Sequence, residues 1–156
     1  MTNTSLPLWE KVSYGFGDTA CNIYFQIVIV YLMQFYTDVF GISAAAAGTM
    51  FLVVRIFDGF TDPMMGAIAD RTDSRWGKYR PYMLWLAIPF AALGILAFVT
   101  PAFSDSGKLI YAYITYSLFM LLYTAINIPY SALGGVMTAS SSERASVQSF
   151  RFAGGM

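Results

Sequence analysis

Long apolar segments separated by short polar ones dominate the chain, and this pattern predicts membrane-spanning helices. The stretches 19–37, 82–104 and 109–142 contain no charged residue, and a spanning helix needs about 20 mostly apolar residues. The segment 43–69 is also long and apolar enough to span, although it contains three charges. We therefore expect an all-α integral membrane protein, with helices over about 13–37, 43–69, 82–100 and 110–137 and the start of a fifth near residue 150.

The composition supports a membrane protein and excludes several other classes. Hydrophobic residues make up 57% of the chain and charged residues only 12%, whereas soluble domains contain about 25% charged residues. Equal numbers of basic and acidic residues argue against nucleic-acid binding. Cys21 is the single cysteine and there is no histidine, so neither a disulfide framework nor a multi-cysteine zinc site is expected. We expect no enzyme activity and no cofactor.

The distribution of basic residues predicts the orientation in the membrane. The loop 70–80 carries four basic residues, Lys11, Arg144 and Arg151 are expected on the same side, and Lys108 alone falls opposite. Because basic residues favour the cytoplasmic side, this bias of seven to one predicts a cytoplasmic N-terminus and a cytoplasmic loop 70–80. The first apolar stretch is long and follows a polar start, so we do not expect a cleaved signal peptide.

The second predicted helix carries three charges on one face. Arg55, Asp58 and Asp62 stand at positions i, i+3 and i+7, so they project within about 60° of one another. Three charges at mid-membrane cost about 8–10 kcal/mol together, and the apolar residues of the helix return only about 2.5–5 kcal/mol. The charged face is therefore expected to point into a polar cavity or the interior of a bundle.

Two interpretations fit these charges. Arg55 and Asp58 could form a buried ion pair that only fixes helix packing, but this leaves Asp62 unexplained. Two carboxylates and one guanidinium sum to −1, which suits one monovalent cation, a proton or sodium. Intramembrane ionisable groups usually mark ion or substrate pathways, so we predict a cation site at Asp58, Asp62 and Arg55, with no other metal site.

A short internal repeat links the first and fourth predicted helices. Residues 19–23 read TACNI and residues 124–128 read TAINI, a match at four of five positions. Many secondary transporters consist of inverted repeats with binding residues near the midplane. The repeated asparagines, Asn22 and Asn127, are therefore candidate substrate ligands. Hydrogen bonding between helices is the competing interpretation.

Further polar residues share the faces of these two asparagines. Asp18 lies one turn before Asn22, and on the fourth helix four residues lie within about 60°: Tyr116, Tyr123, Asn127 and Tyr130. A tyrosine ring beside an amide suits a sugar, because C–H faces stack on the ring while sugar hydroxyls bond the amide. A tyrosine seam packed between helices is the alternative.

The loop after the second helix alternates acids and bases. Its charged members are Asp70, Arg71, Asp73, Arg75, Lys78 and Arg80. We predict that Asp70 and the four basic residues form a breakable cytoplasmic latch that gates transport. A solvated loop that only sets the topology is the alternative.

Several of these motifs are typical of one family. The chain resembles the N-terminal part of the glycoside–pentoside–hexuronide:cation symporters, the melibiose-carrier branch of the major facilitator superfamily. The matching stretches occur in the family's order: 14–18 (YGFGD), 36–41 (YTDVFG), 55–66 (RIFDGFTDPMMG), 74–81 (SRWGKYRP) and 127–130 (NIPY).

The resemblance implies a twelve-helix transporter of the cell or inner membrane that imports a sugar with H⁺, Na⁺ or Li⁺ by alternating access. It places the cation site at Asp58 and Asp62, with Arg55 beside them, and adds Arg151 to the substrate residues. Melibiose carriers have aspartates where this chain has Asn22 and Asn127. The missing carboxylate favours proton coupling over sodium.

The same resemblance implies that residues 1–156 form part of a transporter domain. We expect the partners to be a sugar, a monovalent cation, the lipid bilayer and the remaining C-terminal part of the transporter. A four-helix membrane scaffold and a sugar sensor without transport are the alternative functions.

Overall fold

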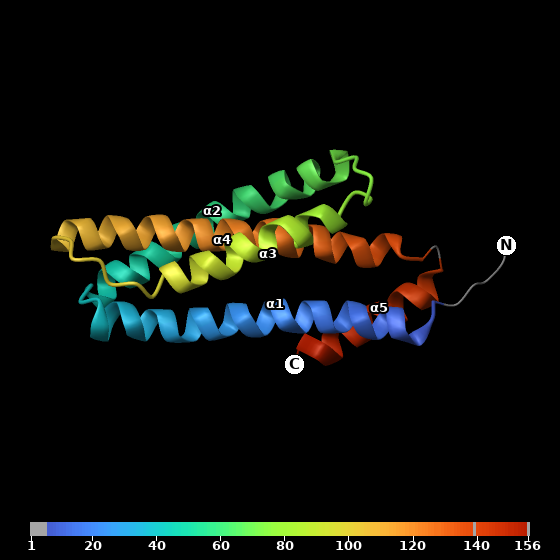
Figure 1. Ribbon diagram of the computed structural model, residues 1–156, viewed down its shortest axis with the longest axis horizontal. Coiled ribbons are helices and arrows are strands. Elements are labelled where there is room, and N and C mark those ends of the chain that lie inside the picture. Colours follow the sequence, from blue (N-terminus) through green and yellow to red (C-terminus); the bar gives the residue numbers. More distant parts are fainter. Residues whose placement is uncertain (1–5, 139, 156) are drawn as a thin grey trace.

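Helices joined by short loops form the whole of the described structure. The computed structural model describes residues 6–138 and 140–155, and no strand occurs among them. In chain order the elements are α1 (Leu8–Gln34), the short π-helix η1 (Phe35–Val39), α2 (Ala44–Arg71), α3 (Arg80–Leu96), α4 (Asp105–Val136) and α5 (Ser141–Gly155) (Figure 1).

The helices lie close to the predicted positions, except at the start of α5. This helix begins at Ser141 rather than near residue 150, so the expected start was wrong. The reason is that its first two turns are polar, and a search for apolar segments does not detect them. Likewise α1 begins at Leu8 and α4 at Asp105, each earlier than expected.

Polar residues at the helix ends explain where the helices begin. The hydroxyls of Ser43 and Ser104 accept hydrogen bonds from the backbone N–H groups of Ala46 and Gly107, at 3.2 and 3.4 Å, and so cap α2 and α4. Gly41 precedes α2 with a φ of +81°. Such a backbone conformation favours glycine, which allows the tight turn out of η1.

Among the described residues, three helical stretches have the length and composition needed to cross a membrane. They are Leu8–Val39, Ala44–Arg71 and Asp105–Val136. The third predicted span, α3, is apolar but has only 17 residues, which correspond to about 25 Å at 1.5 Å per residue.

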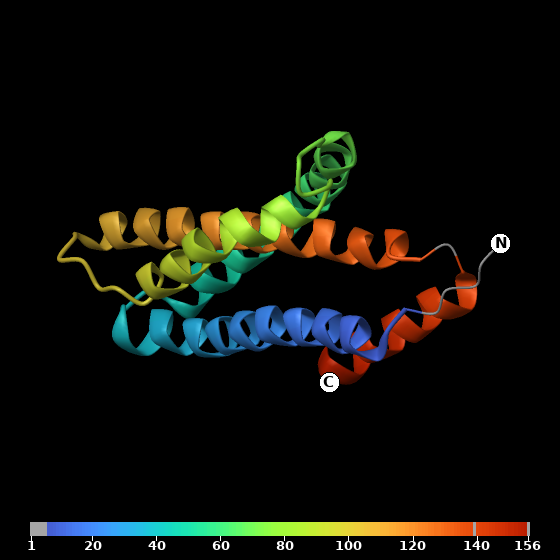
Figure 2. The same cartoon turned by 45° about the vertical axis from the view of Figure 1, so that its right-hand side comes forward.

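The helices pack as two groups joined by a shared core. α2 and α3 pack on α4, and α5 packs along α1. α1 and α4 run the length of the molecule, and α5 doubles back from the end of α4 to lie beside the start of α1 (Figures 1 and 2). Because α5 runs parallel to α1, its residues reach the middle of the bundle.

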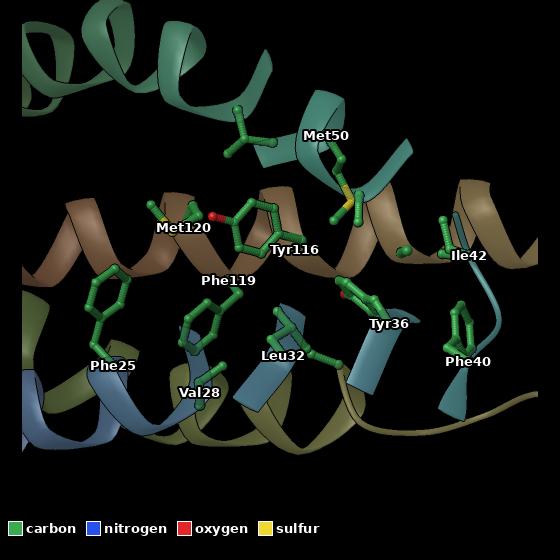
Figure 3. Packing of buried hydrophobic residues seen from close by; sticks show 14 of the residues in the cluster. Phe25, Val28, Leu32, Tyr36, Phe40, Ile42, Met50, Tyr116, Phe119 and Met120 are labelled. Atoms are coloured by element: carbon green, nitrogen blue, oxygen red, sulfur yellow. The ribbon is translucent and has the colours of Figure 1, made fainter. Parts of the chain in front are cut away.

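A hydrophobic core joins the two groups in the half of the bundle that contains η1. Its buried side chains come from α1, η1, α2, α3 and α4 and from the loop between η1 and α2. Figure 3 shows most of them. Phe119 of α4 stacks on Phe25 of α1 and on Phe90 of α3, with ring centroids 6.1 and 4.9 Å apart. Tyr123 lies one turn further along α4 and stacks on Phe25 at 3.8 Å. The core therefore fixes the position of Tyr123.

Near the start of α1, two tyrosines join α1 to α4. The rings of Tyr14 and Tyr130 stack 4.7 Å apart, and each hydroxyl donates a hydrogen bond to the other residue's backbone carbonyl. A Cβ on Gly17 would lie 2.8 Å from the Tyr130 hydroxyl, and one on Gly134 would lie 2.6 Å from the Tyr14 hydroxyl. Both tyrosines therefore occupy space that only glycine leaves open.

Candidate functional site

Five polar side chains from α1, α4 and α5 form a closed ring of hydrogen bonds, which we call the polar ring. Asn22 Nδ2 donates to Asp18 Oδ2 at 3.0 Å, and the Tyr123 hydroxyl donates to Asn22 Oδ1 at 3.2 Å. Asn127 Nδ2 donates to the Tyr123 oxygen at 3.2 Å. Arg151 closes the ring, donating from Nη2 to Asn127 Oδ1 at 3.4 Å and from Nε to Asp18 Oδ1 at 3.0 Å.

Helical spacing and α5 together assemble this ring. Asp18 and Asn22 lie one turn apart on α1, as do Tyr123 and Asn127 on α4, so each pair shares a helix face. The structure thus brings together five of the residues that the sequence suggested as substrate ligands. Arg151, which the charge pattern places with the cytoplasmic basic residues, lies within α5 beside Asp18.

The ring contains one ion pair that is largely removed from water. The side chains of Asp18 and Arg151 are 7% and 19% exposed. Removing one partner of a buried pair is costly because it leaves the other charge uncompensated. The negative and positive charges cancel, so the ring presents donors and acceptors without a net charge.

A cavity lies beside the ring, between α1, α3 and α4. Its volume is about 340 Å³, and Asp18 and Asn127 form part of its lining together with Tyr24, Phe90 and Tyr130. Small-molecule sites typically measure about 300–1,000 Å³ and combine mostly apolar walls with a few convergent polar groups. The cavity has these properties.

The carboxylates of α2 form a second polar group. Asp58 is 7% exposed, and its Oδ2 has no hydrogen-bond partner among the described residues. Asp62, one turn further along, accepts a hydrogen bond at Oδ1 from the Thr124 hydroxyl of α4 at 3.0 Å. A buried carboxylate oxygen without a partner is unfavourable unless a cation or proton satisfies it.

Arg55 does not enclose these carboxylates. Its Nη1 lies 3.8 Å from Asp58 Oδ2, and its side chain is 69% exposed. Within the described residues the Arg55 side chain is therefore exposed, unlike that of Asp58, and is not buried in the helical bundle. The other predicted position for this charge, a polar cavity, stays a prediction. The long distance and the exposure also make this pair a weak packing contact.

Thr124 is a polar contact that the sequence analysis did not select. It lies in the repeated TAINI motif, from which we chose only the asparagine. Its hydroxyl binds Asp62, and its chain neighbour Tyr123 belongs to the polar ring. One turn of α4 thus contacts both polar groups.

Hydrogen bonds and a ring contact hold the loop between α2 and α3, and its predicted role as a gating latch stays a prediction. The Asp70 carboxylate accepts a hydrogen bond from the Tyr79 hydroxyl at 2.7 Å, and Lys78 Nζ donates to the Asp70 backbone carbonyl at 3.2 Å. The bond to Asp70, together with burial, raises the pKa of Tyr79. Arg75 lies over the Trp76 ring at 4.5 Å. No ion pair to Arg71, Arg75, Lys78 or Arg80 occurs within residues 6–138 and 140–155.

The tyrosines predicted on one face of α4 divide between packing and the ring. Tyr116 lies edge-on to Phe51 of α2 at 4.7 Å, and Tyr130 stacks on Tyr14. Only Tyr123 joins the polar ring. Tyr116 and Tyr130 instead pack between helices, which was the alternative interpretation of these tyrosines.

Long apolar helices around an internal polar ring and a buried carboxylate define a membrane protein with a polar site inside its helical bundle. Residues 13–156 match the family model described as MFS/sugar transport protein. The chain therefore belongs to this family of the major facilitator superfamily, which consists of transporters rather than enzymes.

Individual relatives agree with this assignment. The chain is 54% identical over its whole length to the inner membrane symporter YicJ of Escherichia coli, of which it covers 35%. It is 52% identical over 96% of its length to the putative glycoside/cation symporter YagG of the same organism, covering 32% of that protein. It is 48% identical over 94% of its length to the isoprimeverose transporter of Lactiplantibacillus pentosus, covering 30%. The chain thus spans about a third of the length of these relatives.

Proposed function

We propose that this chain forms the N-terminal part of a secondary transporter that carries a sugar together with a monovalent cation by alternating access. The observation that supports this most directly is the polar ring, which joins α1, α4 and α5 inside an otherwise apolar bundle. The relatives named a glycoside/cation symporter and an isoprimeverose transporter agree with a sugar as substrate.

In this proposal the polar ring binds the sugar. Carboxylate, guanidinium, amide and phenol groups supply both donors and acceptors, which a sugar's hydroxyls need. Without a sugar, Asp18, Asn22, Tyr123, Asn127 and Arg151 satisfy one another. A bound sugar replaces some of these bonds with its own hydroxyls, so binding exchanges hydrogen bonds without leaving a buried group unpaired.

The carboxylates of α2 bind the coupling cation, H⁺ or Na⁺. Asp58 supplies an oxygen without a hydrogen-bond partner, and Asp62 is oriented by Thr124. Arg55 lies at the edge of this site, and its positive charge reduces the net negative charge of the two carboxylates. Because Thr124 adjoins Tyr123, a cation that moves Asp62 also acts on α4, which carries two of the five residues of the polar ring.

We also propose that the N-terminus and the loop between α2 and α3 lie in the cytoplasm. The excess of basic residues on that side supports this orientation. Asp70, Arg71, Arg75, Lys78 and Arg80 would then act at the cytoplasmic face. The basic residues without ion pairs within this part of the chain are available to the C-terminal part of the transporter.

The test is sugar uptake by the full-length protein in vesicles from cells that lack their own carriers. Labelled glycosides, pentosides and hexuronides are offered with an inward Na⁺ gradient, with an inward H⁺ gradient, or with neither. We expect accumulation of at least one sugar above the external concentration with one of the gradients. Binding without uptake would indicate a sensor, and neither binding nor uptake of any sugar would favour a scaffold.

A further inference from the structure

The seam between α1 and α5 contains a second ion pair, well away from the polar ring. Lys11 Nζ lies 2.7 Å from Glu143 Oε2 and donates to the Ser146 hydroxyl at 3.1 Å. Glu143 Oε2 also accepts from the backbone N–H of Leu6 at 3.3 Å. Lys11 is only 9% exposed, although a lysine usually lies at the surface.

The two ion pairs of this seam match in spacing and alternate in sign. Lys11 and Asp18 stand seven residues apart on α1, and their partners Glu143 and Arg151 stand eight apart on α5. At 1.5 Å per residue these spacings are about 10.5 and 12 Å. A shift of α5 by one turn breaks both pairs, so together they specify one register between the parallel helices.

Apolar packing specifies this register only weakly. Among the α5 side chains that the structure describes, Val147 alone is buried. One turn further along, α5 approaches α1 by its backbone: a Cβ on Gly15 would lie 2.9 Å from the carbonyl oxygen of Phe150. Because a larger residue would not fit at this close approach, Gly15 also restricts the register, and the ion pair of Lys11 adds a directional contact that apolar packing lacks.

From this geometry we propose that Lys11, through Glu143 and Ser146, is a positioning residue for Arg151. It fixes α5 along α1 so that the guanidinium reaches both Asp18 and Asn127. The inference rests on the proposed function, because it assigns Lys11 a part in sugar binding without contact to the sugar.

A double-mutant cycle on the full-length transporter tests this proposal by sugar affinity. We expect Lys11→Met to weaken sugar binding about tenfold, which is about 1.4 kcal/mol and within the range for coupled residues. In an Arg151→Ala background Lys11→Met should have almost no further effect on affinity. The charge swap K11E/E143K, which re-forms the ion pair with the signs exchanged, should bind sugar almost as tightly as the wild type. Lys108→Met, the same change in a lysine near the far end of the bundle, is the control and should leave affinity unchanged.

A purely structural role gives a different pattern. Lys11→Met would then reduce the amount of folded protein, and any loss of affinity would be the same in both backgrounds. That additive result, or failure of the charge swap, overturns the proposal. If Lys11→Met does not fold, the swap and Ser146→Ala are compared with the wild type by the same affinity assay.

A second measurement needs no sugar and separates this inference from the proposed function. Asp18→Cys and Arg151→Cys are combined in full-length protein lacking all other cysteines, including Cys21, and joined with a short bifunctional thiol reagent. We expect Lys11→Met to slow this cross-linking severalfold and K11E/E143K to restore it. An unchanged rate overturns the positioning role even if sugar transport is established, and a slowed rate supports it even if no sugar binds.

Discussion

Arg151 and Asp18 stand far apart in the sequence, yet Arg151 Nε donates to Asp18 Oδ1 at 3.0 Å inside the bundle. This contact closes the polar ring, and it exists only because α5 runs parallel to α1. The ring is therefore a property of tertiary structure, although each of its members stands out in the sequence as a polar residue within or next to apolar segments.

Replacing Tyr123 by phenylalanine should open the ring without disturbing the core. The ring of Tyr123 keeps its stacking on Phe25, whereas the bonds to Asn22 and Asn127 are lost. We expect a loss of about 1 kcal/mol in stability and a severalfold weaker sugar affinity. Isothermal titration of the full-length protein measures the affinity.

Tyr113→Phe is the matched control, since the Tyr113 hydroxyl makes no hydrogen bond within the described structure. An equal effect of both substitutions on affinity would contradict a role of the polar ring in sugar binding.

Thr124→Val should weaken cation binding. The substitution keeps the shape of the side chain but removes the donor to Asp62 Oδ1. We expect the concentration of cation needed for half-maximal uptake to rise at least tenfold, in line with about 1.5–3 kcal/mol for a hydrogen bond to a charged group. Thr115→Val is the control, because Thr115 donates hydrogen bonds to backbone carbonyls of its own helix. It should leave the cation dependence unchanged. Equal cation dependence of Thr124→Val and the wild type would remove Thr124 from the site.

Gly134→Ala should destabilise the protein, whereas Gly135→Ala should not. A Cβ at Gly134 meets the buried Tyr14 hydroxyl at 2.6 Å, but one at Gly135 meets nothing within 4 Å. Overpacking of this kind costs about 1–3 kcal/mol, and an open helical glycine gains up to about 1 kcal/mol when alanine replaces it. Thermal unfolding of the purified full-length protein distinguishes the two. A similar change in both would contradict the close contact between α1 and α4.

The contribution of Glu143 to stability should depend on pH. A hydrogen bond from Lys11 lowers the pKa of Glu143 below its ordinary value of 4.5. A carboxyl with a lowered pKa stabilises the folded state above its ordinary pKa and loses this effect as the pH falls through the lowered value. We expect Glu143→Gln to lower the melting temperature at pH 6, and the difference from the wild type to shrink as the pH falls below 4.5. A difference that stays constant as the pH falls would contradict a charged Glu143 as the source.

The sequence predicted the helices and the site residues better than it predicted their contacts. Apolar segments identify α1 to α4 because burial in lipid leaves a strong compositional signal. The beginning of α5 leaves no such signal, since its polar first turns lie near the end of the bundle and contain Glu143. The partner of Lys11 was therefore missed.

Contacts between helices depend on distances that spacing within one helix does not contain. The motif that pointed to Asn127 also contained Thr124, but its bond to Asp62 requires the packing of α2 on α4. In the loop, the alternating charges predicted a latch, but they did not reveal that the Asp70 carboxylate accepts a hydrogen bond from the Tyr79 hydroxyl. Which donor binds the Asp70 carboxylate depends on the fold of the loop, and the formal charges of the sequence do not reveal this donor.

The central claim is that Asp58 and Asp62 couple a cation to sugar movement, and uphill sugar accumulation by full-length variants tests it most directly. Asp58→Asn and Asp62→Asn are compared with the wild type at equal amounts in the membrane, with and without the cation gradient. We predict that both variants still exchange sugar down its gradient but no longer accumulate it. Normal accumulation in both single variants would contradict the account.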